Sequence, residues 1–339
     1  MKRNGFNFPA LVLFFLGLPV VLLSQQINSP LFKSHGILHM KLISNYNKVL
    51  EDVGDHTNKH KARIKYTSQN GEKRKIRIKI ETRGNFRSDP GNCDFPPIKL
   101  YFKDYAQTQH TLFEGQEELK LVTHCQQEIK DYARHVYREY LLYRIYNMLT
   151  PYSFQVRLFN INYKPRFGIK NNIKPGFFIE DNDMLASRFG GKELDSDDSY
   201  LPVDSTYYAL VSFFEYMIGN TDWSVEMLQN IEVIQTVKGR NIPVPYDFDI
   251  SACVCPPYAP RALNVDSTTF MKRRYRGPKF SKTIISKVFK IFEEKKPDIL
   301  YLIDESILLK TQEKERFTKY IGGFYREIEN AGEDAIWLK

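Results

Sequence analysis

The stretch that decides the fold is residues 62–84, which reads ARIKYTSQNGEKRKIRIKIETRG. Apolar and basic residues alternate on both sides of Asn70-Gly71, and this period of two is typical of β-strands with one buried face. Asn-Gly favours a type I′ turn, so the stretch predicts a β-hairpin. Solvation of the outer sheet face explains its lysines and arginines without any ligand.

Further β-strands are expected around this hairpin, because short runs of β-branched and aromatic residues lie between turn-forming residues. These runs are GILHMKLIS at 36–44, FPPIKLYF at 95–102, ELKLVTHC at 118–125, FQVRLFNINY at 154–163 and KPGFFIED at 174–181. Helices are predicted where apolar residues recur every three or four positions. The helical stretches are 128–149, 205–219, 280–296 and 313–330.

This order of elements predicts an α+β chain built from two lobes. Residues 25–180 would form a β-rich N-terminal lobe with one long helix, and residues 181–339 would form a mainly helical C-terminal lobe. The join between the lobes is expected near residues 176–183. A length of 339 residues fits one large bilobed domain or two ordinary domains.

Residues 1–24 are expected to be a secretory signal peptide. Lys2 and Arg3 precede an apolar run at 10–23, and a short polar exit follows. The run is shorter than the ~20 residues of a membrane-spanning helix, and Pro19 interrupts it, which argues against an uncleaved anchor. We therefore expect an exported protein, in the periplasm, at the cell surface or secreted, with no transmembrane helix in the mature chain.

The whole chain carries a formal net charge of +9, and loss of the signal peptide, whose charges are Lys2 and Arg3, would leave +7. This charge favours acidic partners, phosphate groups among them, but no basic block of the kind that binds nucleic acid is present in the sequence. Disulfides are permitted in an exported chain, and buried free thiols fit the sequence equally well. The cysteines are Cys93, Cys125, Cys253 and Cys255.

Three polar residues stand at the ends of short elements in the second half of the chain. Asp222 follows the helix expected at 205–219, Asn230 directly precedes a strand-like run, and the returning strand leads to Asp247. An antiparallel hairpin would therefore place Asn230 and Asp247 together, with Asp222 a loop away. The alternative is that each residue only stabilises a turn, which is a common role for Asp and Asn.

Such a set of oxygen atoms suits phosphoryl transfer. Mg²⁺ prefers carboxylate and amide oxygens and keeps room for phosphates among its ligands. A further carboxylate nearby can orient or deprotonate the attacking hydroxyl. The pattern therefore favours a phosphotransferase site at the end of this hairpin.

The chain resembles the CotH-like atypical protein kinases, in a branch of exported bacterial proteins. The resemblance covers roughly residues 80–262 and rests on the motifs TRGNFRSDPGNCDFPPIKLYF, LFEGQEELKLVTHC, EYLLYRIYNMLTPYSFQVRL, GFFIEDNDMLASRFGG, YMIGNTDWS and VPYDFDISACVCPPYAPR. It implies a bilobed protein-kinase-like fold, with ATP and Mg²⁺ or Mn²⁺ as cofactors. It also implies that the acceptor of the phosphoryl group is a serine or threonine hydroxyl of a protein.

The same resemblance implies roles for the polar residues of the second half. Asp222 would be the catalytic base, Asn230 a metal ligand and Asp247 the main metal ligand. Asp249 is a second acid of the same motif, and it would be either a further ligand or the anchor of a backbone turn.

A phosphate-anchoring lysine is expected in the first half. Lys120 precedes the helix that carries Glu139, which is the order of the strand lysine and helix glutamate in protein kinases. Lys99, on another strand, is the rival lysine. Arg83 would contact phosphates from the turn that follows the hairpin.

The chain departs from the protein-kinase pattern at three motifs. It has no H-R-D before Asn230, no G-x-G-x-x-G loop and no D-F-G, in whose place stands Asp247-Phe248-Asp249. These departures leave two alternatives to a phosphotransferase. One is a pseudokinase-type binding or structural protein of the cell envelope, and the other is a metal-dependent hydrolase.

Overall fold

The computed structural model describes residues 29–53, 57–84, 86–165, 172–194 and 202–330. The predicted signal peptide, residues 1–24, lies outside the described residues. Within the described ranges, no helix combines the length and the apolar character that crossing a membrane requires.

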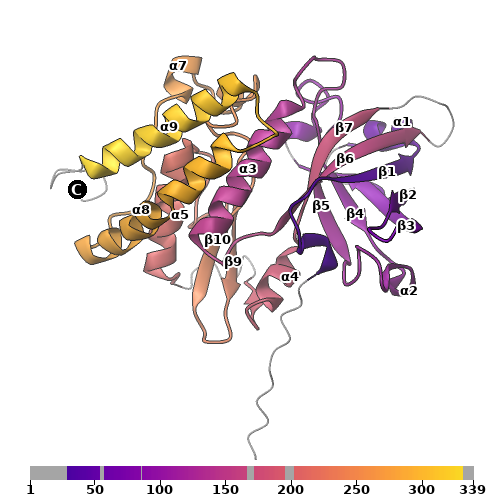
Figure 1. Ribbon diagram of the computed structural model, residues 1–339, viewed down its shortest axis with the longest axis horizontal. Coiled ribbons are helices and arrows are strands. Elements are labelled where there is room, and N and C mark those ends of the chain that lie inside the picture. Colours follow the sequence, from indigo (N-terminus) through magenta and orange to yellow (C-terminus); the bar gives the residue numbers. More distant parts are fainter. Residues whose placement is uncertain (1–28, 54–56, 85, 166–171, 195–201, 331–339) are drawn as a thin grey trace, which may run out of the picture.

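Seven strands form a closed barrel (Figure 1). The strand order is β1-β2-β3-β4-β5-β7-β6, and every neighbouring pair is antiparallel except β1 and β6, which are parallel. Apolar side chains fill the interior and alternate with exposed polar ones along β2, as the period of two requires. The strands are β1 (Leu38–Ser44), β2 (His60–Thr67), β3 (Lys73–Thr82), β4 (Ile98–Tyr101), β5 (Glu118–Val122), β6 (Val156–Pro165) and β7 (Ile173–Ile179).

The expected bilobed, protein-kinase-like fold, with a β-rich N-terminal lobe and a mainly helical C-terminal lobe, is wrong. The parallel pairing of β1 with β6 closes the first sheet into a mixed barrel. A second, three-stranded sheet lies among the helices of the later half, in the order β10-β9-β8. Local patterns predict single strands and hairpins, but they carry no signal for a pairing between strands far apart in the chain. The strands of the second sheet are β8 (Lys192–Glu193), β9 (Ile231–Gln235) and β10 (Asn241–Pro245).

The hairpin expected at residues 62–84 is confirmed, but its turn is not of type I′. β2 and β3 pair from His60 opposite Ile80 to Thr67 opposite Lys73. In the loop, Gly71 donates its N–H to the carbonyl of Ser68 and is left-handed, with φ of 84°. A type I′ turn needs two left-handed residues, so the observed loop is one of the longer hairpin loops that require a single glycine.

The long helices pack beside the barrel, with α3 between the barrel and the others (Figure 1). Their buried apolar side chains form one core together with residues of β6 and β7. The long helices are α3 (Arg134–Leu149), α5 (Ser205–Ile218), α8 (Lys282–Asp304) and α9 (Thr311–Glu329). The short ones are η1 (Pro30–Phe32), α1 (Tyr46–Glu51), η2 (Phe86–Ser88), α2 (Tyr105–Thr108), α4 (Asn182–Ser187), α6 (Ala259–Ala262) and α7 (Ser267–Phe270).

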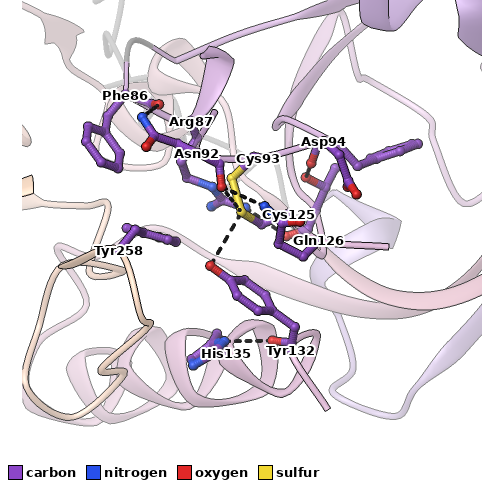
Figure 2. The surroundings of a disulfide bond; sticks show 12 residues. Phe86, Arg87, Asn92, Cys93, Asp94, Cys125, Gln126, Tyr132, His135 and Tyr258 are labelled. Carbon is purple, nitrogen blue, oxygen red and sulfur yellow. Dashed lines mark hydrogen bonds between the residues drawn. A yellow bond between two sulfur atoms is a disulfide. The ribbon is translucent and has the colours of Figure 1, made fainter. Parts of the chain in front are cut away.

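The helix expected at 128–149 begins later, at Arg134. Asp131 is left-handed, with φ of 61°, and a right-handed helix cannot continue through such a residue. A disulfide joins Cys125 to Cys93 and ties the loop after β3 to the segment between β5 and α3 (Figure 2). The other two cysteines are not bonded to each other: Cys253 is a buried free thiol and Cys255 a half-buried one.

Candidate active site

The open end of a β-hairpin brings Asn230 and Asp247 together. β9 and β10 pair antiparallel along their whole length. The pairing continues one step beyond the strands, because Tyr246 donates its N–H to the carbonyl of Asn230 at 3.0 Å. Asn230 (φ 53°) and Asp247 (φ 61°) are both left-handed, a conformation that Asn and Asp tolerate better than most residues. The hairpin predicted from the sequence is therefore present, with one polar residue at each strand end.

Asp222 is held beside Asn230 by amide donors. α5 ends at Gly219, which is left-handed with φ of 69°, and the loop that follows carries Asp222. The Nδ2 of Asn230 donates to the carbonyl of Asp222 at 2.6 Å and to its carboxylate at 3.2 Å. The Nε2 of Gln229 donates to the other carboxylate oxygen at 2.5 Å. These bonds orient the carboxylate and engage the nitrogen of Asn230, so the amide oxygen of Asn230 is the atom that remains for a cation.

Asp247 carries a half-buried carboxylate next to two other acids. Its backbone N–H donates to the hydroxyl of Tyr143 at 2.8 Å. In the part of the chain that the structure describes, no donor lies within hydrogen-bond distance of the carboxylate itself. Burial, and then the negative charge of Asp247, raise the pKa of Asp222 and of Asp249. The three acids are therefore close enough to repel one another.

Asp249, unlike Asp247, is braced by protein groups. Its Oδ2 accepts a 2.5 Å hydrogen bond from the hydroxyl of Tyr258, and the Nη1 of Arg87 lies 3.8 Å from the same oxygen. Arg87 is itself buried and donates from Nη2 to the carbonyl of Thr123 at 2.8 Å. Asp249 thus has an internal cation and a hydroxyl donor as partners, which fits the role of a structural anchor at this site.

Glu139 is the fourth acid of the group and lies fully buried on α3. Its Oε1 has no hydrogen-bond partner among the described residues. Burial, and then the charges of Asp249 and Asp247, raise the pKa of Glu139 well above its usual range, while Arg87 and Arg83 oppose the rise. We call Asp222, Asp247, Asp249 and Glu139 the acidic cluster.

Lys120 does not pair with Glu139. Its Nζ donates to the Oδ1 of Asn182 at 2.9 Å and lies 3.9 Å from a carboxylate oxygen of Glu232. Burial, and then the positive charge of Arg83, lower the pKa of Lys120. Lys99 lies directly opposite Lys120 across β4 and β5, and its Nζ forms an ion pair with Glu118.

Arg83 is near both Lys120 and Glu139 of the acidic cluster. Its positive charge lowers the pKa of Lys120 and opposes the rise in the pKa of Glu139. Its backbone N–H is bonded to the carbonyl of Pro97, which fixes the start of the loop after β3. The Nε of Arg83 is buried and has no partner among the described residues. Arg83 is therefore the cation best placed to bind an anion beside the acidic cluster.

A divalent cation could bind at this cluster only if ligands from outside the protein, such as phosphate or water oxygens, completed its coordination. Among the described residues, no three histidine, cysteine, aspartate or glutamate side chains are already arranged to hold a metal ion. A cation bound by Asp247 and by the amide oxygen of Asn230 would need phosphate or water oxygens for its other positions, a coordination typical of Mg²⁺. The carboxylate of Asp247, half-buried without a protein donor, is the observation that favours a cation here.

Two residues of this site, Tyr143 and Arg87, were not predicted from the sequence. Tyr143 lies four residues after Glu139, and this helical spacing places both on one face of α3, so the signal was available. Arg87 reaches the cluster from η2, six residues before the disulfide-bonded Cys93, and no local pattern indicates its contact with Asp249. Figure 2 shows Arg87 beside this disulfide. No protein-family model matches the chain, and no curated protein matches it.

Proposed function

We propose that the chain is a phosphotransferase that moves the γ-phosphoryl group of ATP to a protein serine or threonine hydroxyl, with Mg²⁺ or Mn²⁺ as cofactor. The observation that supports this proposal is the meeting of Asp222, Asn230 and Asp247 at one end of the β9–β10 hairpin. The positive charges of Arg87 and Arg83 act on Glu139 of the same acidic cluster, and the binding of a triphosphate requires such cations.

Each residue has a role in this reaction. A bound divalent cation would neutralise charge on the transferred phosphoryl group, and Asp247 with Asn230 would hold it. Asp222 orients the acceptor hydroxyl and takes its proton, for which a raised pKa is an advantage. The hydroxyl oxygen bonds to the γ-phosphorus, the bond to the β–γ bridging oxygen breaks, and ADP leaves. Arg83 and Lys120 bind phosphate oxygens.

The proposal is tested with γ-labelled ATP and either Mg²⁺ or Mn²⁺. The purified chain is compared with Asp222→Asn, with Asp247→Asn and with Asp298→Asn, an exposed acid of α8 that serves as the control. We expect the chain to label itself or an added mixture of serine and threonine peptides. Removal of the base should lower the rate by roughly 10²–10⁴-fold, Asp247→Asn should abolish the metal-dependent signal, and the control should keep it.

Two other outcomes would reject the proposal in favour of a specific alternative. Label that appears only as inorganic phosphate, with the same dependence on Asp222, would identify water as the acceptor and the chain as a hydrolase. Metal-dependent binding of ATP with neither transfer nor release would identify a binding protein. Equal labelling by all four proteins would place any activity outside the acidic cluster.

A further inference from the structure

A groove of about 350 Å³ lies on the outer face of the barrel, over β2 and β3 and beside the short helix α2. Figure 1 shows these elements on the side of the molecule far from α8 and α9. Five basic side chains and one acid, Asp104, line the groove. The basic side chains are Lys61, Arg63, Arg77, Lys79 and Lys103.

The basic residues of the two strands stand opposite one another rather than opposite acids. The register places Lys61 against Lys79 and Arg63 against Arg77. Directly opposite residues of antiparallel strands have Cβ atoms about 4.5–5.5 Å apart, and like charges at that distance destabilise the sheet. Within the described residues none of these four side chains forms an ion pair, and the neighbouring acids Asp52 and Glu72 pair with His60 and Arg74 instead. Solvent screens this repulsion, and an anion bound across the two strands would relieve it further.

The wall of the groove is built by α2. The amide N–H of Arg77 lies on the part of β3 that extends beyond its pairing with β4, and it donates to the Oε1 of Gln107 at 3.1 Å. This bond ties α2 over the free edge of β3. Ile43 from β1 adds an apolar side to the groove. The basic side chains thus line a concave site rather than an open sheet face.

We propose that this groove binds a linear chain of phosphate groups without bases, of the kind represented by inorganic polyphosphate. Successive outward side chains of one strand are roughly 7 Å apart and those of neighbouring strands about 5 Å apart, so the cations form a ladder that matches closely repeated anions. A phosphate has enough acceptor oxygens to receive hydrogen bonds from two guanidinium groups, and Arg63 and Arg77 supply such a facing pair.

The composition of the groove favours this ligand over nucleic acid. Single-stranded nucleic acids are bound by cations together with aromatic side chains on which the bases stack. The described residues that line the groove include no aromatic side chain. The groove lies on the barrel's outer face and uses none of the acidic cluster, so the proposal stands independently of the phosphotransferase proposal.

The test measures binding of fluorescently labelled polyphosphate to the full chain by anisotropy at several salt concentrations. Arg63→Gln/Arg77→Gln is compared with Lys287→Gln/Lys319→Gln, which removes the same two charges from exposed positions of α8 and α9. We expect the first double variant to bind at least tenfold more weakly and the second to bind within twofold of the unchanged chain. The slope of log affinity against log salt should fall by about 0.7 for each lost phosphate contact.

Thermal unfolding separates lost binding from lost folding. Because Arg63→Gln/Arg77→Gln removes a like-charge pair, it should unfold at the same temperature as the unchanged chain or at a higher one. Equal weakening by both double variants would overturn the proposal, since net charge alone would then explain the binding. Equal or tighter binding of a polyuronate or of oligo-dT would also overturn it, because the groove would then select carboxylates or nucleic acid.

Discussion

The backbone N–H of Asp247 donates a 2.8 Å hydrogen bond to the hydroxyl of Tyr143. Tyr143 is fully buried on α3, one helical turn after Glu139, and its ring packs against Phe248 with centroids 4.6 Å apart. This bond links α3 to the end of β10 and holds Asp247 in its left-handed conformation, where its carboxylate joins the acidic cluster.

Tyr143→Phe should therefore destabilise the chain. The substitution keeps the ring but leaves the N–H of Asp247 without its acceptor, at a cost of about 1–3 kcal/mol. Tyr146→Phe is the matched control, because Tyr146 lies on the same helix, equally buried, and its hydroxyl has no partner among the described residues. Urea unfolding should show a lower midpoint for Tyr143→Phe and an unchanged or higher one for Tyr146→Phe. An equal decrease of the urea midpoint in both variants would mean that the hydrogen bond to Asp247 does not contribute to stability.

The fold was predictable from sequence only where it depends on local chemistry. The Asn70-Gly71 hairpin and the end of α5 at Gly219 are confirmed, since turn residues and left-handed caps act within a few positions. The closure of the barrel by β1 and β6 was not predictable, because the sequence of neither strand indicates which other strand it pairs with. That one pairing makes the difference between the expected lobe and the observed barrel.

The candidate site was likewise predictable from the sequence only where it depends on local structure. Antiparallel pairing across a short turn predicts that Asn230 and Asp247 come close, and the register sets Asn230 opposite Tyr246, the residue before Asp247. The partner of Lys120 depends instead on how α4 and β9 pack against β5, which brings Asn182 and Glu232 to its Nζ. Tertiary packing determines which side chains from separate elements contact one another, and these contacts cannot be predicted from a single sequence.

Substitutions of the three candidate phosphate anchors should separate their roles, if the chain transfers phosphate as proposed. Arg83→Gln and Lys120→Gln should each raise the KM for ATP about tenfold, because a charged hydrogen bond contributes roughly 1.5–3 kcal/mol and a factor of ten corresponds to about 1.4 kcal/mol. Lys99→Gln should change the KM less than about twofold, since Lys99 is engaged with Glu118. Initial rates at varied ATP concentration measure these effects. A larger increase of the KM for ATP in Lys99→Gln than in Lys120→Gln would identify Lys99, rather than Lys120, as the phosphate-binding lysine.

Reduction of the Cys93–Cys125 disulfide should weaken the fold. The bond closes a loop with a sequence separation of 32 residues, for which the chain-entropy estimate is about 3–4 kcal/mol. It also fixes the loop after β3, in which Arg87 precedes Cys93 by six residues and contacts Thr123 and Asp249. A reducing agent should lower the urea midpoint of the unchanged chain and of Cys255→Ser, but not that of Cys93→Ser. An unchanged midpoint for the unchanged chain would show that the bond does not stabilise the fold.

Glu313 at the start of α9 should give stability that depends on pH. Its carboxylate accepts hydrogen bonds from the guanidinium groups of Arg134 and Arg138 on α3 and from the N–H of Lys310. Burial raises the pKa of Glu313, but these hydrogen bonds outweigh it and lower the pKa to about 2 from its usual 4.5. A carboxylate with a lowered pKa stabilises the folded state above its unfolded pKa, and this stability is lost as the pH falls through the folded pKa.

Glu313→Gln should therefore lower the free energy of unfolding at pH 7 by about 1–2 kcal/mol, once screening by solvent is included. The difference from the unchanged chain should shrink below pH 4.5 and approach zero near pH 2, because protonation then removes the same charge from both proteins. Urea unfolding at pH 7, 5, 4 and 3 measures this trend. Glu315→Gln, an exposed change on the same helix, should stay within about 0.5 kcal/mol at every pH. A constant difference for Glu313→Gln from pH 7 to pH 3 would show that packing, rather than the charge on this carboxylate, joins α9 to α3.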